Sequence, residues 1–479
     1  MIVRYYFIRW FYRYSLLILL GVQSGWVHAD DDFRIWVSSE NNLDNNAGDG
    51  AMFVFDGEPP HNLLARIDPE QKKSHHPWIS PDDRYALGTN RVSNSVTMYD
   101  VNALTVQATI SLGPNPTHVQ WGRLDGQYRF AFVGITSGVA AGGGYVSVID
   151  LVDQMEVAQI PEDVAARQNG THDADVTPDG RYVYFGNVGS NTVFKIAINA
   201  ERGFPLEQTL EVGMSASAAD VHVQGVRILP SGEKMYVSNE EGSVSVVELN
   251  YEEADEVLTT IDVTGGADDT GVHNSRISPD GRWVYVGSRN TGIVNVIDTE
   301  TDTLVANIEA GMGANTPEFS PDGKYNLVPN QATDFVSIID VETHRKIADI
   351  MTGQGPHNAR FSPDGDFAFV TCKDDNVVSV IDMRNLTLLH NLEVDANPNG
   401  IEIQRVDEDG QGINGVDGLA LLVSGAQVES TETKNKPIAE PSVVKGSGLG
   451  GITVLLLLGS WLLGRYRLLG IKAEACSSR

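Results

Sequence analysis

The sequence predicts an all-β protein, a single eight-bladed β-propeller closed by strands from both ends of the chain. A turn of the type Ser-Pro-Asp-Gly recurs at a spacing of about 42–54 residues. Each interval holds four short runs rich in Val, Ile, Tyr and Phe. Short strands separated by turns indicate an all-β fold, and a long repeat with four strands per unit is typical of propeller blades.

The recurring turn has a conformational explanation. Proline sets φ for the second position, aspartate caps its own backbone, and glycine adopts the left-handed conformation at the end. We therefore assign its aspartate to hairpin geometry and not to catalysis. The seven turns are residues 80–83, 123–126, 177–180, 229–232, 278–281, 320–323 and 362–365.

The ends of the third strands set the blade count. They fall at Asp56, Asp100, Asp150, Ala197, Glu248, Asp298, Asp340 and Asp382. The first of these ends precedes every inner strand, so we expect residues 400–404 to supply the missing inner strand of that blade. A blade shared by both chain ends removes an open sheet edge. Seven blades is the alternative, because residues 34–37 and 419–423 both resemble the second strand of the closing blade.

Histidine recurs at one position of the repeat, eight residues before the last residue of the turn. Five of the 11 histidines share this position: His75, His118, His172, His273 and His357. Other repeats carry Gln224, Asn315 and, by alignment of the flanking residues, Asn399 there. First strands line the channel of a propeller, so one position per blade becomes a ring near one mouth of that channel.

A ring of imidazoles indicates a metal or cofactor site, because imidazole suits Cu, Zn, Fe and Ni. The alternative is polar packing, in which the histidines bind channel water and neighbouring backbone groups. We expect the five histidines to bind a cofactor, with His222 as a further candidate metal ligand. No catalytic residue is assigned. His61, His344 and His390 fall outside the shared position, and we expect them at the surface.

Charge and cysteine content exclude several functions. The chain has 34 basic and 64 acidic residues, a formal net charge of −30. This balance argues against nucleic-acid binding, which needs clustered Lys and Arg. Cys372 and Cys476 are its only cysteines, so the sequence has no disulfide framework and no Cys-x-x-Cys-His run to attach a c-type haem.

Both ends of the chain carry targeting signals. Residues 1–29 read as a signal peptide, with three arginines, a short apolar run and a small-residue cleavage site. Residues 30–426 form the propeller, and residues 427–448 have the composition of a flexible linker. Residues 449–469 are apolar and contain the stop signal Arg465 and Arg467. They predict a transmembrane anchor with the propeller outside the cytoplasm.

The segments Met235-Tyr-Val-Ser-Asn239 and Trp283-Val-Tyr-Val-Gly-Ser-Arg-Asn290 resemble YVTN-type propeller repeats, a resemblance that extends over residues 33–425. The apolar C-terminal run also resembles the GlyGly-type sorting signals of Gram-negative bacteria. These resemblances imply a propeller in the periplasm or at the cell surface of such a bacterium.

The spacing of histidine ahead of the Pro-Asp turn is similar to that in two propellers, the haem d domain of periplasmic nitrite reductases and the copper-cluster propeller of nitrous-oxide reductase. The resemblance implies that the five histidines hold copper or a haem-type tetrapyrrole. His76, His222 and Asp173 would orient their rings by hydrogen bonds. The chain departs from both enzymes in lacking a haem c module and a cupredoxin-like domain, so electrons would come from a partner protein.

Two functions follow from these features. The first is a membrane-tethered propeller whose channel binds a transition metal or tetrapyrrole, for redox chemistry or cofactor handling. The alternative is a non-catalytic scaffold that binds a protein or surface ligand. Hydrolysis of a small ester or lactone in the channel is a third candidate.

Overall fold

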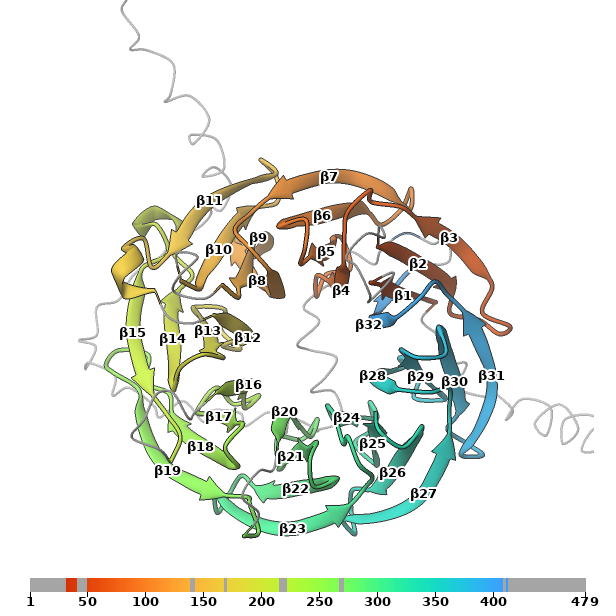
Figure 1. The fold of residues 1–479 in the computed structure, drawn as a ribbon. Coiled ribbons are helices and arrows are strands. Elements are labelled where there is room, and N and C mark those ends of the chain that lie inside the picture. The colour runs from red at the N-terminus through yellow and green to blue at the C-terminus, as the bar shows by residue number, and fades with distance from the viewer. Residues whose placement is uncertain are drawn as a thin grey trace, which may run out of the picture. The chain divides into compact units, whose positions relative to one another are not determined.

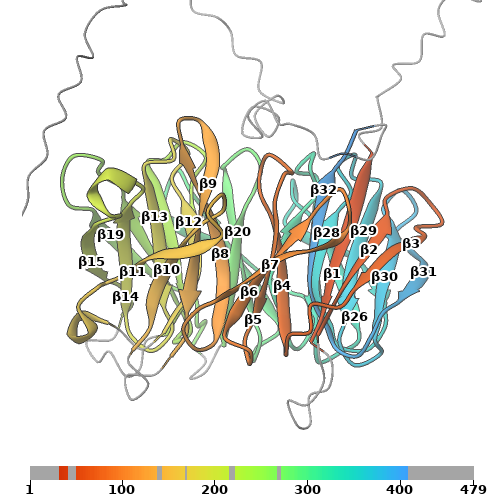
Figure 2. The ribbon, with the colours of Figure 1, turned by 90° about the horizontal axis from the view of Figure 1, so that it is seen from above.

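The computed structural model describes residues 32–40, 50–137, 143–167, 170–214, 222–266, 271–407 and 411. Within these residues, 32 strands form eight four-stranded antiparallel sheets. The sheets stand as blades in a ring, with the first strand of each at the centre (Figure 1). Seen from the side, the inner strands β4 and β8 run along the ring axis (Figure 2). Eight blades are therefore confirmed over seven.

We number the blades from the one that contains β1. From the centre outward, blade 1 is β32 (Pro398–Arg405), β1 (Phe33–Ser39), β2 (Ala51–Asp56) and β3 (Leu63–Ile67). Blade 2 is β4 (Ser74–Ile79), β5 (Ala86–Asn90), β6 (Ser95–Asp100) and β7 (Thr105–Ser111). Blade 3 is β8 (Pro116–Leu124), β9 (Gln127–Ile135), β10 (Tyr145–Asp150) and β11 (Met155–Ile160). Blade 4 is β12 (Thr171–Val176), β13 (Tyr182–Asn187), β14 (Thr192–Ala197) and β15 (Leu206–Glu211).

Blade 5 is β16 (Val223–Ile228), β17 (Lys234–Asn239), β18 (Ser243–Glu248) and β19 (Glu256–Asp262). Blade 6 is β20 (Val272–Ile277), β21 (Trp283–Ser288), β22 (Ile293–Asp298) and β23 (Thr303–Glu309). Blade 7 is β24 (Glu318–Phe319), β25 (Tyr325–Asn330), β26 (Phe335–Asp340) and β27 (Arg345–Met351). Blade 8 is β28 (Pro356–Phe361), β29 (Phe367–Cys372), β30 (Val377–Asp382) and β31 (Thr387–Glu393). The described residues also form two short 3₁₀ helices, Val164–Ala166 between β11 and β12 and Ala200–Arg202 between β14 and β15.

Blade 1 closes the ring as predicted. β32 pairs with β1 from Phe33↔Arg405 to Ser39↔Pro398. Its end is held by Asp83 of blade 2, which accepts hydrogen bonds from the Arg405 backbone N at 3.1 Å and from Nε at 3.0 Å. Asp83 has a φ of 56° at the position where all six other turns have glycine. The hydrogen bonds of its carboxylate to Arg405 explain why aspartate is tolerated there, although aspartate is less suited than glycine to a positive φ.

Hydrophobic cores lie between successive blades. In blades 3 and 4, Phe132, Phe185 and Phe194 are completely buried, and Phe204 packs edge-on against Phe130 and Phe132. Each buried aromatic side chain contributes about 1.5–3 kcal/mol by its removal from water. These contacts join neighbouring blades, so the ring is stabilised as a unit.

Three tyrosines of second strands hydrogen bond to the next blade. Tyr184 Oη donates to Asp255 Oδ2 at 2.7 Å, and Tyr236 Oη donates to Asp302 Oδ1 at 2.6 Å. Tyr285 Oη bonds to His344 Nδ1 at 2.8 Å. We call this arrangement the tyrosine contact between blades.

The three histidines predicted at the surface are in fact packed against aromatic rings. His344 lies edge-on to Trp283, with ring centroids 4.4 Å apart. His61 is only 1 % exposed, and its ring centroid is 5.5 Å from that of the half-buried His390. The prediction was wrong for His61 and His344 because the turns that carry them fold onto the preceding blade, whereas His390 lies in strand β31 beside His61.

None of the helices in the described part of the chain is long and apolar enough to cross a membrane. The predicted signal peptide, linker and anchor lie outside the described residues, as does the alternative strand at 419–423.

Candidate functional site

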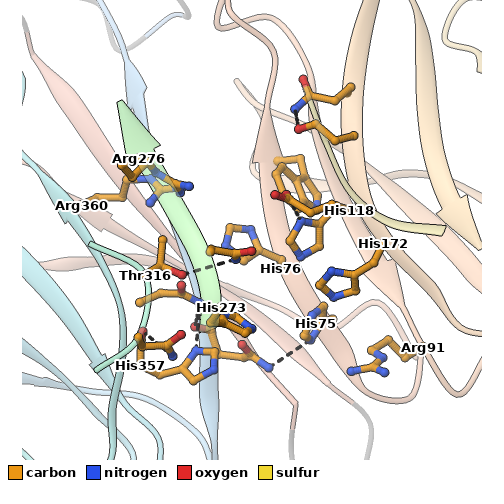
Figure 3. A pocket seen from close by; sticks show the side chains of 18 of the residues that line it. His75, His76, Arg91, His118, His172, His273, Arg276, Thr316, His357 and Arg360 are labelled. Carbon is orange, nitrogen blue, oxygen red and sulfur yellow. Dashed lines mark hydrogen bonds and ion pairs between the residues drawn. The ribbon is translucent and has the colours of Figure 1, made fainter. Parts of the chain in front are cut away.

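A polar cavity of about 510 Å³ lies at the centre of the ring (Figure 3). All eight blades contribute to its wall, mostly through their inner strands. The cavity takes in all five histidines predicted as cofactor ligands: His75, His118, His172, His273 and His357. The structure therefore brings the predicted site residues together.

A β-bulge in the inner strands directs side chains into this cavity. In blade 2, Ser74 pairs with Asn90 and Pro77 pairs with Gly88, so two inner-strand residues oppose one residue of the second strand. The same offset occurs between β12 and β13, between β20 and β21 and between β28 and β29. A bulge bends its strand and redirects the side chains of the extra residue. We call its first residue the ring position and its second residue the inner position.

The pairing corrects the place of one predicted histidine. In blade 3, Pro116 pairs with Ile135 and Val119 pairs with Val133, so Thr117 takes the ring position and His118 the inner position. The β8–β9 hairpin is longer than the others and has a second bulge between Gly122 and Arg123. Counting back from the turn glycine therefore misplaces His118 by one residue.

With this correction, the ring-position histidines alternate around the propeller. His75, His172, His273 and His357 stand in blades 2, 4, 6 and 8. Blades 1, 3, 5 and 7 carry Asn399, Thr117, Gln224 and Asn315 at the ring position. Imidazole thus occurs in every second blade, an approximately fourfold arrangement.

His75 forms a pair with a buried carboxylate. Its Nδ1 lies 2.8 Å from Glu40 Oε1, and Glu40 also accepts hydrogen bonds from the side-chain amides of Asn397 and Asn399. Burial opposes ionisation of Glu40, but the bond from His75 and the nearby positive charge of Lys373 outweigh it and hold the pKa of Glu40 at about 2. Burial lowers the pKa of His75 to about 4, against the opposing effect of Glu40. At neutral pH His75 is therefore uncharged, donates Nδ1–H to Glu40 and keeps a lone pair on Nε2.

His118 has its own carboxylate. Its Nδ1 lies 2.8 Å from Asp173 Oδ1, and Asp173 Oδ2 accepts from Arg227 Nη1 at 2.7 Å and from Val226 N at 3.1 Å. Burial alone would raise the pKa of Asp173, but the Arg227 guanidinium and His118 hold it far below its usual range. The predicted role of Asp173 in orienting an imidazole agrees with this geometry, because its carboxylate accepts from Nδ1 of His118.

The other imidazoles differ in their partners. Nδ1 of His172 and Nδ1 of His273 are buried and have no hydrogen-bond partner among the described residues. His357 Nδ1 accepts from the Asn358 amide at 2.9 Å, so its ring proton lies on Nε2. His76 Nδ1 donates to Pro77 O at 2.5 Å. Burial lowers the pKa of His76, His172, His273 and His357 well below the usual range, so these rings are uncharged at neutral pH.

The cavity is locally cationic in an acidic chain. Of the arginines that line it, Arg227 pairs with Asp173, Arg276 with Glu318, and Arg360 with both Glu318 and Glu402. The four remaining cations form no salt bridge with a carboxylate of the described residues: Lys73, Arg91, Arg289 and Lys373. Because a positive lining attracts anions, the cavity favours an anionic ligand.

Sequence reasoning missed Glu40 and these four cations. Glu40, Arg91, Arg289 and Lys373 each follow directly after the last residue of a second strand. A second shared position of the repeat was therefore present in the sequence. Its side chains differ in charge, so no single residue type revealed it.

The metal assignment gains no support from the geometry. No group of three or more His, Cys, Asp or Glu in the described part of the chain is placed to hold a metal ion. His222 lies outside the cavity wall, has a half-exposed side chain and bonds to Glu240 at 2.9 Å. Ring centroids are 4.4 Å apart for His118 and His172 and 6.4 Å apart for His75 and His118.

Fold and site together define an eight-bladed propeller with a histidine-lined axial cavity. A model of the family "Lactonase, 7-bladed beta-propeller" matches residues 142–346, less than half of the chain. The structure is similar to dihydro-heme d1 dehydrogenase NirN in complex with DHE, at 20 % identity over 77 % of this chain and 74 % of that chain, with a TM-score of 0.60.

Two further structures share the fold. The putative 6-phosphogluconolactonase of Bacteroides fragilis is 18 % identical over 79 % of this chain and 99 % of its own, with a TM-score of 0.52. Apo AztD of Citrobacter koseri is 12 % identical over 78 % of this chain and 97 % of its own, with a TM-score of 0.55. These likenesses confirm the β-propeller, and the expected similarity to a haem d propeller is found at the level of fold.

Proposed function

We propose that the axial cavity binds an anionic, haem-type tetrapyrrole, for redox chemistry or for handling of the cofactor itself. The observation that carries this proposal is the alternation of uncharged imidazoles at the ring position of every second blade. A tetrapyrrole is a planar ring of four similar units, so side chains that repeat in every second blade match its symmetry. A cavity of about 510 Å³ is within the usual range for small-molecule sites.

The unsatisfied groups of the cavity suit such a ligand. Nδ1 of His172 and Nδ1 of His273 are buried without partners, and imidazole nitrogen is a common ligand of haem iron. Lys73, Arg91, Arg289 and Lys373 would pair with carboxylates at the edge of the macrocycle. When bound, the tetrapyrrole would supply one-electron chemistry.

The two carboxylate–imidazole pairs have a positioning role in this proposal. Burial keeps His75 neutral and Glu40 orients its ring, so that Nε2 of His75 is free to accept a proton or a hydrogen bond, while Asp173 orients the ring of His118. His357 has the opposite tautomer and would donate from Nε2. The cavity thus combines an accepting imidazole, His75, with a donating one, His357, and Figure 3 shows where these two rings lie.

A direct test adds haem to the purified, ligand-free full-length protein and records the visible spectrum. We expect one haem per chain, and we expect His172→Ala combined with His273→Ala to weaken binding by about 10–100-fold, as loss of supporting groups does at metal sites. The matched control is His222→Ala, which removes an imidazole outside the cavity wall. Unchanged haem affinity in the double variant, or no binding at all, contradicts the proposal.

The cellular setting belongs to the same proposal. We infer an exported protein in the periplasm or at the cell surface, tethered through residues 449–469 and served by an electron-transfer partner. The signal-like segment at residues 1–29 supports export, and the absence of a c-type haem attachment sequence supports an external electron source.

A second candidate is hydrolysis of an anionic sugar lactone. The lactonase family match over residues 142–346 and the Glu40–His75 pair favour it, because a carboxylate-oriented imidazole can act as a general base on water. The unpaired cations would hold the anionic group of the substrate.

Glu40→Gln distinguishes this candidate from tetrapyrrole binding. We expect lactone hydrolysis, followed by proton release with 6-phosphogluconolactone, to fall by about 100-fold or more in this variant, because His75 loses its charged partner. His222→Ala should leave the rate unchanged. If neither haem binding nor hydrolysis is observed, the non-catalytic scaffold is the function that remains.

A further inference from the structure

The turn between β2 and β3 places a buried histidine against blade 8. His61 has a φ of 59° and is 1 % exposed, and its ring lies edge-on to Phe367 and Phe369 at centroid distances of 5.4 and 5.2 Å. His61 Nδ1 lies 3.3 Å from Asp56 O, so Nδ1 carries the proton and Nε2 the lone pair. This Nε2 is buried and has no hydrogen-bond partner in the part of the chain that the structure describes.

A second imidazole of blade 8 shares this pocket. His390 of β31 has its ring centroid 5.5 Å from that of His61, and its Nε2 is also buried with no hydrogen-bond partner within the described ranges. A single unsatisfied buried nitrogen is costly, and two in one apolar pocket are unusual in a folded protein. The pair lies in the outer part of the ring and shares no residue with the axial cavity.

The repeat itself shows what is missing at this junction. Tyr285 of blade 6 and Phe369 of blade 8 occupy equivalent positions, since they pair with Arg276 and Arg360 of their inner strands. His344 and His61 likewise share a turn after the third strand and a positive φ. His344 receives a hydrogen bond from Tyr285, whereas Phe369 has no hydroxyl to offer His61. Between blades 8 and 1, a second histidine, His390, thus replaces the tyrosine contact between blades.

We propose that His61 and His390 bind one Cu(I) ion between their Nε2 atoms, in a site separate from the axial cavity. A metal–imidazole bond is about 2.0 Å long, which allows one ion to join two rings at this separation. Two neutral donors among phenylalanines cannot offset the charge of a divalent cation removed from water. Cu(I) carries a single charge, accepts two-coordinate geometry and binds imidazole.

The test uses the ligand-free full-length protein, loaded with Cu(I) without oxygen and then desalted. We expect His390→Leu to lose one equivalent of bound copper relative to the unsubstituted protein. The channel variant His172→Ala with His273→Ala keeps this equivalent, as does His344→Leu, which removes the matched histidine of blade 7. X-ray absorption of the copper in the channel variant should show two nitrogen neighbours.

Phe369→Tyr provides a test that removes neither histidine. The new hydroxyl would donate to Nε2 of His61, the nitrogen without a partner among the described residues, whereas Tyr285 bonds to Nδ1 of His344. We therefore expect this variant to fold and to lose the same equivalent of copper. If Phe369→Tyr and His390→Leu both bind as much Cu(I) as the unsubstituted protein, the proposal is overturned, and a shared water satisfies the two nitrogens.

Discussion

Asp173→Ala is expected to lower the free energy of unfolding by about 3–5 kcal/mol, the usual cost of breaking a buried ion pair. Asp173 is 3 % exposed and its carboxylate accepts from His118, Arg227 and Val226 N. Without it, the largely buried Arg227 guanidinium loses its salt-bridge partner and His118 loses the group that sets its tautomer. The loss combines an uncompensated charge with an unsatisfied backbone N–H.

Asp175 offers a matched control in the same strand. Burial raises the pKa of Asp175, against the opposing effect of Arg227, so its ionised form is not favoured by the cavity. Asp175→Asn should therefore cost less than about 1 kcal/mol, within the range of a single neutral hydrogen bond. Urea unfolding at pH 7.5 measures both variants. Equal losses for Asp173→Ala and Asp175→Asn would show that Asp173 has no special role.

Acid is expected to unfold the ligand-free propeller steeply, starting near neutral pH. Burial lowers the pKa of five cavity histidines below the unfolded value of 6.5: His75, His76, His172, His273 and His357. The unfolded chain therefore binds more protons than the folded chain as the pH falls below 6.5. Stability is complete above that pH and is lost below it, by about 1.4 kcal/mol per pH unit for each histidine. Together they account for up to about 7 kcal/mol per pH unit.

The carboxylates extend this loss to lower pH. The pKa of Glu40 is lowered from 4.5 to about 2, so its contribution is present above pH 4.5 and is lost as the pH falls toward 2. Urea midpoints at pH 8, 7, 6 and 5 would measure the histidine effect. His273→Gln removes one titrating ring, and we expect its slope to be shallower by about 1.4 kcal/mol per pH unit. An unchanged slope would mean that His273 is charged in the folded protein.

The repeat in the sequence predicted most of the fold. The Pro-Asp-Gly turns and the Val- and Tyr-rich runs act within a few residues, so eight blades and the closing strand near residue 400 were predicted correctly. His118 was placed one residue off because the longer β8–β9 hairpin and its extra bulge put the ring position one residue further from the turn glycine than in the other blades.

The chemistry of the cavity was only partly predictable. Four histidines at one repeat position identified the cavity wall. The carboxylate partner of His75 was not predictable, because Glu40 belongs to another blade. The place of Lys373 and Arg289 in the cavity wall was not predicted either, because their position in the repeat, directly after a second strand, carries residues of both charges. His61 was missed for a similar reason, since its burial depends on how one turn packs against Phe367 and Phe369 of blade 8.

The sequence by itself determined a closed propeller with imidazoles near its axis, because turn chemistry and strand alternation are local and repeat in every blade. Tertiary structure decided which imidazoles face each other, which of them have a carboxylate or amide partner, and which cations remain unpaired. Those properties depend on bulge register and on contacts between residues as far apart as Glu40 and Asn399. Only closure of the ring brings such residues within hydrogen-bonding distance, and their burial there then sets the protonation states of the site.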